Sequence, residues 1–230
     1  MPRKPSSPII GTEYNIGNDE IDCAFQIDQG QLDGARIFSS REEFVKHLPK
    51  GIKFMEVGVA WGYYSKLVAD QCSPSSIDLV DWYNQDLKCW SWRKFGECQC
   101  TPKHELKYNA DSHEQYIIEE FSKYKNVKTY KGEAEDILLT MDNNYDYIYL
   151  DITNDRKPIW TALDLASKCT KVDGIIGLND YVIYDGVIED KPYATFQVVN
   201  EFLKSHSNWR VHSIALHVLG FNDIYLKRCY

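Results

Sequence analysis

The stretch Lys53-Phe-Met-Glu-Val-Gly-Val-Ala-Trp-Gly-Tyr-Tyr-Ser65 decides the fold class of this chain. Phe54, Met55 and Val57 are apolar and flank a single acid, Glu56. This pattern is typical of a buried strand in a parallel sheet. Gly58 and Gly62 follow, and glycine permits a tight turn and a close approach of the backbone because it has no Cβ. The residues after Gly62 have the apolar spacing of a helix. A strand, a glycine turn and a helix N-terminus together predict a small-molecule site at the carboxyl edge of an α/β sheet.

Strand and helix patterns alternate along the rest of the chain. Two apolar runs joined at Gly220 predict a closing hairpin. The pattern as a whole predicts an α/β fold with a doubly wound, mostly parallel, Rossmann-like sheet of about seven strands and an antiparallel C-terminal hairpin. The further strands are expected at residues 76–82, 126–130, 145–151, 175–180, 209–219 and 221–227.

The domain organisation follows from where this alternation is lost. Residues 1–34 are rich in Pro, Gly, Asn and Asp, and we interpret them as an irregular N-terminal arm. Residues 35–230 form one ligand-binding domain, with a lid-like insertion at about 83–110, because a minimal α/β unit uses a shorter connection. The insertion leaves a zinc site open as an alternative, although no C-x₂-C pair is present. Its candidate ligands are Cys89, Cys98, Cys100 and His104.

Composition limits the classes of partner. The net charge of −8 disfavours unaided binding to nucleic acid, since neutralising phosphates needs clustered Lys and Arg. No apolar segment approaches the length of ~20 residues that a membrane span needs. The 7 Cys are an odd number and no secretion signal is evident, which favours reduced thiols and a cytoplasmic location. We therefore expect a small-molecule acceptor as partner, with no nucleic acid and no membrane, and leave a homo-oligomer open.

Asp81 is the candidate for binding a ribose. It ends the second predicted strand, and its distance from Gly58 is near the ~20 residues at which an acid binds ribose hydroxyls in nucleoside-binding α/β folds. A carboxylate suits this role because its two oxygens accept from two neighbouring hydroxyl groups. A dinucleotide cofactor is disfavoured because the third glycine of its fingerprint is missing, and Tyr64 stands where a small residue is wanted.

The pattern Glu56-x-Gly58-x-x-x-Gly62 resembles motif I of the class I S-adenosylmethionine (SAM) dependent methyltransferases. This resemblance runs from about Phe38 to the C-terminus, covers the insertion poorly, and implies SAM as the cofactor. In that family the motif I loop lies beneath the methionine part of SAM, and the loop corresponding to Gly132-Glu133-Ala134 meets the adenine. The cofactor-binding residues that we expect are Glu56, Gly58, Gly62, Asp81, Trp82, Glu133, Ala134 and Asp151.

A second cluster is expected where the fourth and fifth strands end. Asp151, Asn179 and Asp180 place hard oxygen ligands there, which suit Mg²⁺. In the catechol and macrocin-type O-methyltransferases, residues of this kind hold a metal that lowers the pKa of the acceptor hydroxyl. The match departs from that pattern in three ways: the Asn-Asp order is reversed, Asn154 stands where a Lys is usual, and Thr153 stands where an Asp is usual. The catalytic candidates are Asp151 and, as general bases, Asp155 and His217.

These features predict an enzyme that transfers a methyl group from SAM to a hydroxyl of a small molecule or sugar, with Mg²⁺ as an optional second cofactor. Two alternatives stay open. One is a metal-independent methyltransferase acting on nitrogen or on a protein side chain. The other is a nucleoside-binding or interaction module that keeps the fold without the chemistry.

Overall fold

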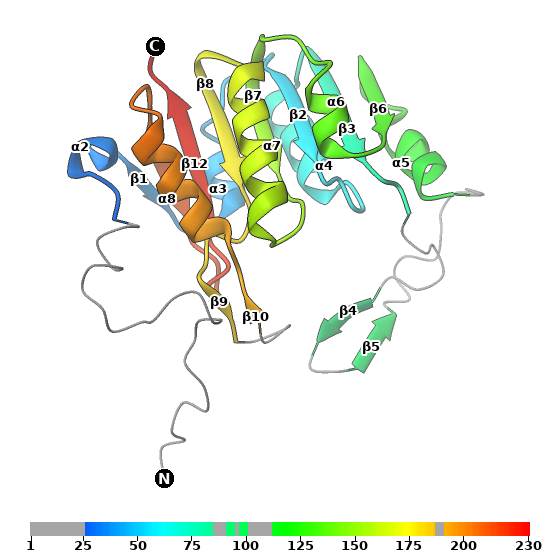
Figure 1. Ribbon diagram of the computed structural model, residues 1–230. Coiled ribbons are helices and arrows are strands. Elements are labelled where there is room, and N and C mark those ends of the chain that lie inside the picture. Colours follow the sequence, from blue (N-terminus) through cyan, green and yellow to red (C-terminus); the bar gives the residue numbers. More distant parts are fainter. Residues whose placement is uncertain (1–25, 85–90, 95–96, 101–111, 187–190) are drawn as a thin grey trace.

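The computed structural model describes residues 26–84, 91–94, 97–100, 112–186 and 191–230. One eight-stranded sheet runs through it in the order β1-β11-β12-β8-β7-β2-β3-β6 (Figure 1). β12 is antiparallel to both of its neighbours, and every other neighbouring pair in this sheet is parallel. The strands are β1 (Arg36–Phe38), β2 (Lys53–Val57), β3 (Ser76–Asp81), β6 (Val127–Lys131), β7 (Tyr145–Leu150), β8 (Thr170–Leu178), β11 (Trp209–Ala215) and β12 (Asp223–Arg228).

This arrangement confirms the predicted Rossmann-like sheet with its C-terminal hairpin, β11–β12. The sequence missed β1, which adds an eighth strand by pairing in parallel with β11. The strand expected at 175–180 also begins earlier, because β8 starts at Thr170 and includes residues 171–174. Asp173 has a left-handed backbone there, with φ of 64°, and the register with β7 shifts nearby. This irregular part of the strand lacks the regular pattern by which a sequence indicates a strand.

Helices cover both faces of the sheet. Alternate residues of β2 show why, since Phe54 joins the core on one face and Met55 joins the core on the other. The first core contains residues from α3 (Arg41–Val45), α4 (Tyr63–Cys72) and α5 (His113–Phe121). The second contains residues from α6 (Ala134–Leu138), α7 (Arg156–Cys169) and α8 (Thr195–Ser205).

Smaller elements complete the described chain. β4 (Ser91–Lys94) and β5 (Glu97–Cys100) form a separate two-stranded sheet inside the predicted insertion, and β9 (Tyr184–Asp185) pairs with β10 (Lys191–Pro192). The side chains of Cys89, Cys98, Cys100 and His104 lie outside the described residues. At the end of the predicted arm, α2 (Gln29–Leu32) docks onto the domain, because the Gln31 amide donates to the carbonyl of Leu203 at 2.6 Å.

The order of strands reverses beside β2. From β2 the chain moves outward to β3 and β6, and it then returns to β7 on the other side of β2. Ligands of such sheets bind outside the carboxyl ends of the strands at this reversal. No helix in the described parts of the chain is long and apolar enough to cross a membrane.

Candidate functional site

Gly58 lies at the reversal point, and its backbone is in close contact with two neighbouring strands. Its N–H donates to the carbonyl of Val80 at 2.8 Å. Its φ of 88° favours glycine, and a Cβ at this position would lie 1.7 Å from the backbone oxygen of Asp151. The space that a side chain would need is therefore filled by the end of β7. The close approach that the sequence implied at Gly58 includes the protein's own backbone.

Gly62 starts α4 and allows another close contact. It has φ of 75°, and a Cβ there would lie 2.6 Å from the ring of Phe121 on α5. The second glycine of the motif thus lets α5 pack against the loop. Together, the two glycines fix the loop between β2 and α4 against β7 on one side and α5 on the other.

Glu56 stabilises the same loop by binding the start of α4. Its carboxylate is 1% exposed and accepts hydrogen bonds from the backbone N–H of Ser65, at 3.0 Å, and from the Ser65 hydroxyl. Burial raises the pKa of Glu56 well above its usual range, and the nearby carboxylates of Asp151 and Asp81 raise it further. Glu56 therefore ties the end of β2 to the first turns of α4, and its predicted contact with the cofactor stays a prediction.

Asp81 connects the glycine loop to β3. One carboxylate oxygen accepts from the backbone N–H of Ala60 at 2.9 Å, and the other accepts from the N–H of Tyr83 at 2.8 Å. Each oxygen keeps a further lone pair, because a carboxylate offers about four acceptor positions. The ring of Trp82, the next residue, is 54% exposed. This arrangement leaves Asp81 and Trp82 able to meet a ligand at the sheet edge.

Glu133 and Ala134 lie at the end of the next strand. β6 pairs with β3 so that Lys131 faces Asp81, and the N–H of Gly132 donates to the carbonyl of Asp81 at 3.1 Å. Glu133 is exposed at the N-cap of α6, and Ala134 is half-buried. The structure thus brings these two residues to the same sheet edge as Asp81 and Trp82.

The ends of β7 and β8 meet as the sequence predicts. The Asn179 amide donates to a carboxylate oxygen of Asp151 at 2.9 Å. Asp180 follows with a left-handed backbone, φ 55°. Burial is the main cause that raises the pKa of Asp180 to about 7, and the carboxylates of Asp151 and Asp223 add to it. Burial also raises the pKa of Asp151.

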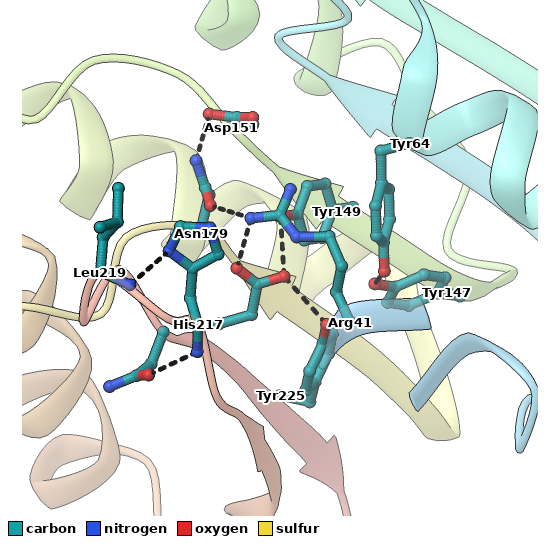
Figure 2. Close-up of polar contacts among 11 residues, drawn as sticks. Arg41, Tyr64, Tyr147, Tyr149, Asp151, Asn179, His217, Leu219 and Tyr225 are labelled. Atoms are coloured by element: carbon teal, nitrogen blue, oxygen red, sulfur yellow. Dashed lines mark hydrogen bonds and ion pairs between the residues drawn. The ribbon is translucent and has the colours of Figure 1, made fainter. Parts of the chain in front are cut away.

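Arg41 is a functional candidate that the sequence did not indicate. It is the first residue of α3, and one guanidinium nitrogen, Nη2, donates to the amide oxygen of Asn179 at 2.8 Å and to Asp223 at 3.0 Å. Figure 2 shows the resulting chain of contacts from Asp151 through Asn179 to Arg41. Burial acts to lower the pKa of Arg41, but Tyr149 and the carboxylates of Asp223 and Asp151 raise it above its usual value, so Arg41 is a permanent cation at this edge.

Two tyrosine hydroxyls fix the carboxylate of Asp223. Its second oxygen accepts from the hydroxyls of Tyr149 and Tyr225, each at 3.0 Å. The ring of Tyr64 stacks on that of Tyr149, with 3.8 Å between their centroids, and its hydroxyl is hydrogen bonded to Tyr147 (Figure 2). Burial raises the pKa of Asp223 to about 6, and Arg41 opposes this shift.

The predicted magnesium ligands do not fit a metal site in this arrangement. The Asn179 amide donates to Asp151 with its nitrogen and accepts from Arg41 with its oxygen, so the oxygen that a metal would need faces a cation. The described residues contain no group of three or more His, Cys, Asp and Glu side chains that could hold a metal ion. Mg²⁺ binding therefore stays a prediction without support from these contacts.

The two predicted general bases lie in different places. His217 is in the loop between β11 and β12, whereas the sequence indicated a strand, and its Nδ1 accepts from the N–H of Leu219 at 3.4 Å. Burial and then Arg41 lower the pKa of His217, which favours the neutral ring. Asp155 is exposed at the N-cap of α7 and accepts from Thr153 at 3.2 Å. Only His217 shares a pocket with Arg41.

That pocket has a volume of about 390 Å³ and lies beside the Arg41 contacts. A volume of this size is within the range of sites for small molecules. Its walls are mixed, with aromatic side chains, one cation and two acids. The lining includes Arg41, Glu42, Tyr63, Tyr64, Leu67, His217, Phe221 and Asp223.

Solved structures with the same fold were found, although no family model and no curated protein matches the sequence. A candidate rRNA methylase from Clostridium thermocellum has a TM-score of 0.57 and 12% identity, over 89% of this chain and 97% of its own. A SAM-dependent methyltransferase from Aquifex aeolicus has a TM-score of 0.52 and 17% identity, over 86% and 93%. The O-methyltransferase TomG from Streptomyces achromogenes, solved with SAM, has 0.51 and 17%, over 88% and 77%.

The fold is that of the SAM-dependent methyltransferases. Within this methyltransferase fold, the sheet edge at β2, β3 and β6 carries the residues expected for the cofactor. The edge at β7, β8 and β12 carries the Arg41 contacts and the adjoining pocket. The named structures include an rRNA methylase and an O-methyltransferase, so the fold by itself does not identify the acceptor.

Proposed function

We propose that this protein is a SAM-dependent methyltransferase that transfers a methyl group to a hydroxyl oxygen of a small molecule. The observation that carries the proposal is the glycine loop between β2 and α4, which Asp81 fastens at the point where the strand order reverses. The likeness of the fold to methyltransferases, one of them solved with SAM, supports it.

The described residues fit SAM in position and in chemistry. Gly58 and Gly62 bring the loop backbone to the sheet edge where the strand order reverses, and Asp81 would accept from the ribose hydroxyls there. Trp82 offers an exposed ring for the adenine, at the same edge as Glu133 and Ala134. SAM, when bound, supplies an activated methyl group on a positively charged sulfur. The backbone of Asp151 packs against the same loop at Gly58, and its carboxylate would balance that charge.

The position of Arg41 favours a metal-independent form of this function. Its guanidinium already contacts Asn179, which a divalent metal would otherwise need. Methyl transfer depends largely on holding the two reactants in line, so a positioned hydroxyl group can react without metal assistance. Transfer to nitrogen or to a protein side chain remains the alternative with the same cofactor.

The test is calorimetric titration of S-adenosylhomocysteine and SAM into three proteins: the wild type, Asp81→Ala and a control, Asp142→Ala. The side chain of Asp142 is exposed and lies in the loop before β7. We expect Asp81→Ala to weaken both ligands equally, by about 10- to 100-fold, because both carry the same ribose and a hydrogen bond to a charged group contributes about 1.5–3 kcal/mol. The control should bind as the wild type does.

Circular dichroism must accompany this titration, because Asp81 also accepts from two backbone N–H groups. Loss of one ligand but not the other in a folded variant would contradict the ribose role. A folded wild-type protein that binds neither ligand would overturn the proposed function and favour an interaction module.

A further inference from the structure

We infer that Arg41 serves as the built-in cation of the acceptor site and binds the oxygen of a neutral aromatic acceptor that carries a single hydroxyl group. This inference rests on the proposed function and names the substrate class of the same site. Its basis is the arrangement of Arg41 between the strand ends and the pocket of about 390 Å³.

Arg41 contacts Asn179, one of the three residues at which a metal was expected. Its Nη2 lies 2.8 Å from the oxygen of Asn179, and Asn179 in turn donates to Asp151. The side chain comes from α3, whereas Asn179 and Asp151 follow β8 and β7, so the cation is brought in from a distant part of the chain. A guanidinium and a divalent metal would compete for the same amide oxygen, and the guanidinium is covalently part of the protein.

The guanidinium is held in one orientation. Asp223 binds it at 3.0 Å, and the carboxylate of Asp223 is itself fixed by two tyrosine hydroxyls. The central carbon of the guanidinium, Cζ, also lies 5.8 Å from the centre of the Tyr64 ring. A planar group that is fixed in this way loses little further freedom when it binds a ligand.

Part of the guanidinium remains available to a ligand. All of its hydrogen bonds to described residues use Nη2, which leaves the N–H groups of Nη1 and Nε without a hydrogen-bond acceptor in that part of the chain. The side chain of Arg41 is 28% exposed and lines the pocket. These donors can therefore meet an oxygen atom of a molecule in the pocket.

The other walls define what that molecule is. Tyr63, Leu67 and Phe221 supply apolar and aromatic surface, which suits a flat ring. Glu42 and Asp223 are acids in the same lining, so an acceptor with an extra negative charge would be repelled. The remaining donors, on Nη1 and Nε, do not share an edge of the guanidinium because Nη2 belongs to both edges and is already bound. Each of them can therefore bind a single oxygen, whereas a metal gains from two neighbouring hydroxyls.

The experiment measures binding of 4-ethylphenol and ethylbenzene by calorimetry in EDTA, with S-adenosylhomocysteine present. The two probes differ only by the hydroxyl group. We expect the wild type to bind 4-ethylphenol about 10-fold or more tightly than ethylbenzene, since a hydrogen bond from a charged group contributes about 1.5–3 kcal/mol. The Arg41→Ala variant should lose this preference, and Arg41→Lys should retain part of it. Arg210→Ala, on the exposed face of β11, is the control and should behave as the wild type does.

Two results would overturn the inference while the proposed function stands. One is a preference for 4-ethylphenol that Arg41→Ala keeps, or that the wild type lacks, in protein that binds S-adenosylhomocysteine. The other is binding of catechol that Mg²⁺ strengthens in the wild type, since this would return the cation role to a metal. If the folded wild-type protein does not bind S-adenosylhomocysteine, the proposed function itself is overturned.

Discussion

The two halves of the sheet edge are built in different ways. On the β2–β3 side, Glu56, Gly58, Gly62, Ser65 and Asp81 lie close together in sequence and mainly fix backbone groups. On the β8–β12 side, Arg41 contacts partners that are 138 and 182 residues away. The first half is a local motif, and the second is a network of side chains that exists only in the folded chain.

This difference has an energetic consequence. The glycine loop depends on close backbone packing, which tolerates almost no added volume. The Arg41 network depends on buried charges and hydroxyls that satisfy one another, so the loss of one partner leaves the others unpaired. Substitutions in the two halves should therefore fail for different reasons.

The largest effect is expected in the glycine loop. Gly58→Ala should lower the free energy of unfolding by about 3 kcal/mol or more, because φ is 88° and the new Cβ would meet the Asp151 backbone at 1.7 Å. The control is Gly51→Ala, with φ of 73° but open space around the Cβ, which should cost about 1 kcal/mol. Urea denaturation measures both. Equal losses would show that backbone conformation alone, and not the contact with β7, makes Gly58 necessary.

The next effect concerns the side-chain network. Asp223→Ala should cost about 2–4 kcal/mol, because it leaves Arg41 and the hydroxyls of Tyr149 and Tyr225 without their shared acceptor. The exposed pair of Lys168 and Asp164 gives a control, where Asp164→Ala should cost less than about 1 kcal/mol.

A double-mutant cycle with Arg41→Ala then tests whether the network acts as a unit. The effects of Arg41→Ala and Asp223→Ala should differ from additivity by about 0.5–3 kcal/mol in urea denaturation. Additive losses would mean that Arg41 and Asp223 contribute independently. The contacts on the β8–β12 side of the sheet edge would then not form a cooperative network.

A smaller effect is expected at Asp180 and depends on pH. Its pKa is raised to about 7 in the folded protein, so the folded state binds a proton more tightly than the unfolded state does. The stability that this group contributes is complete below the ordinary carboxyl pKa and is lost as pH rises toward 7. Asp180→Asn should therefore raise Tm by a few degrees at pH 8 and change it little at pH 4, because Asn never carries the charge that burial disfavours in the folded state. Asn also tolerates the left-handed backbone at this position. The same change in Tm at both pH values would contradict the assignment of a raised pKa.

Much of the fold could be predicted because its signals are local. Ser40 and Ser112 cap the helices that follow them, since their hydroxyls accept from the N–H groups of Glu43 and Gln115, three residues on. The glycine pattern of the motif placed β2, its turn and α4 correctly. β1 was missed because three residues, two of them exposed, carry no periodic pattern.

The candidate site was predictable only in part. The ends of strands β2, β3, β7 and β8 indicated where carboxylates would gather, because parallel strands end at one edge. The sequence carried no sign that the guanidinium of Arg41 would reach Asn179.

By itself, the sequence determined the succession of most strands and helices along the chain, the glycine loop and the set of acids at one sheet edge. These features follow from hydrophobic periodicity and from residues within one or two turns of each other. Only the tertiary structure decided which cation faces those acids and that Asp223 and two tyrosines hold it in place. The physical reason is that a side-chain contact across 138 or 182 residues depends on how helices and strands pack, which no local pattern records.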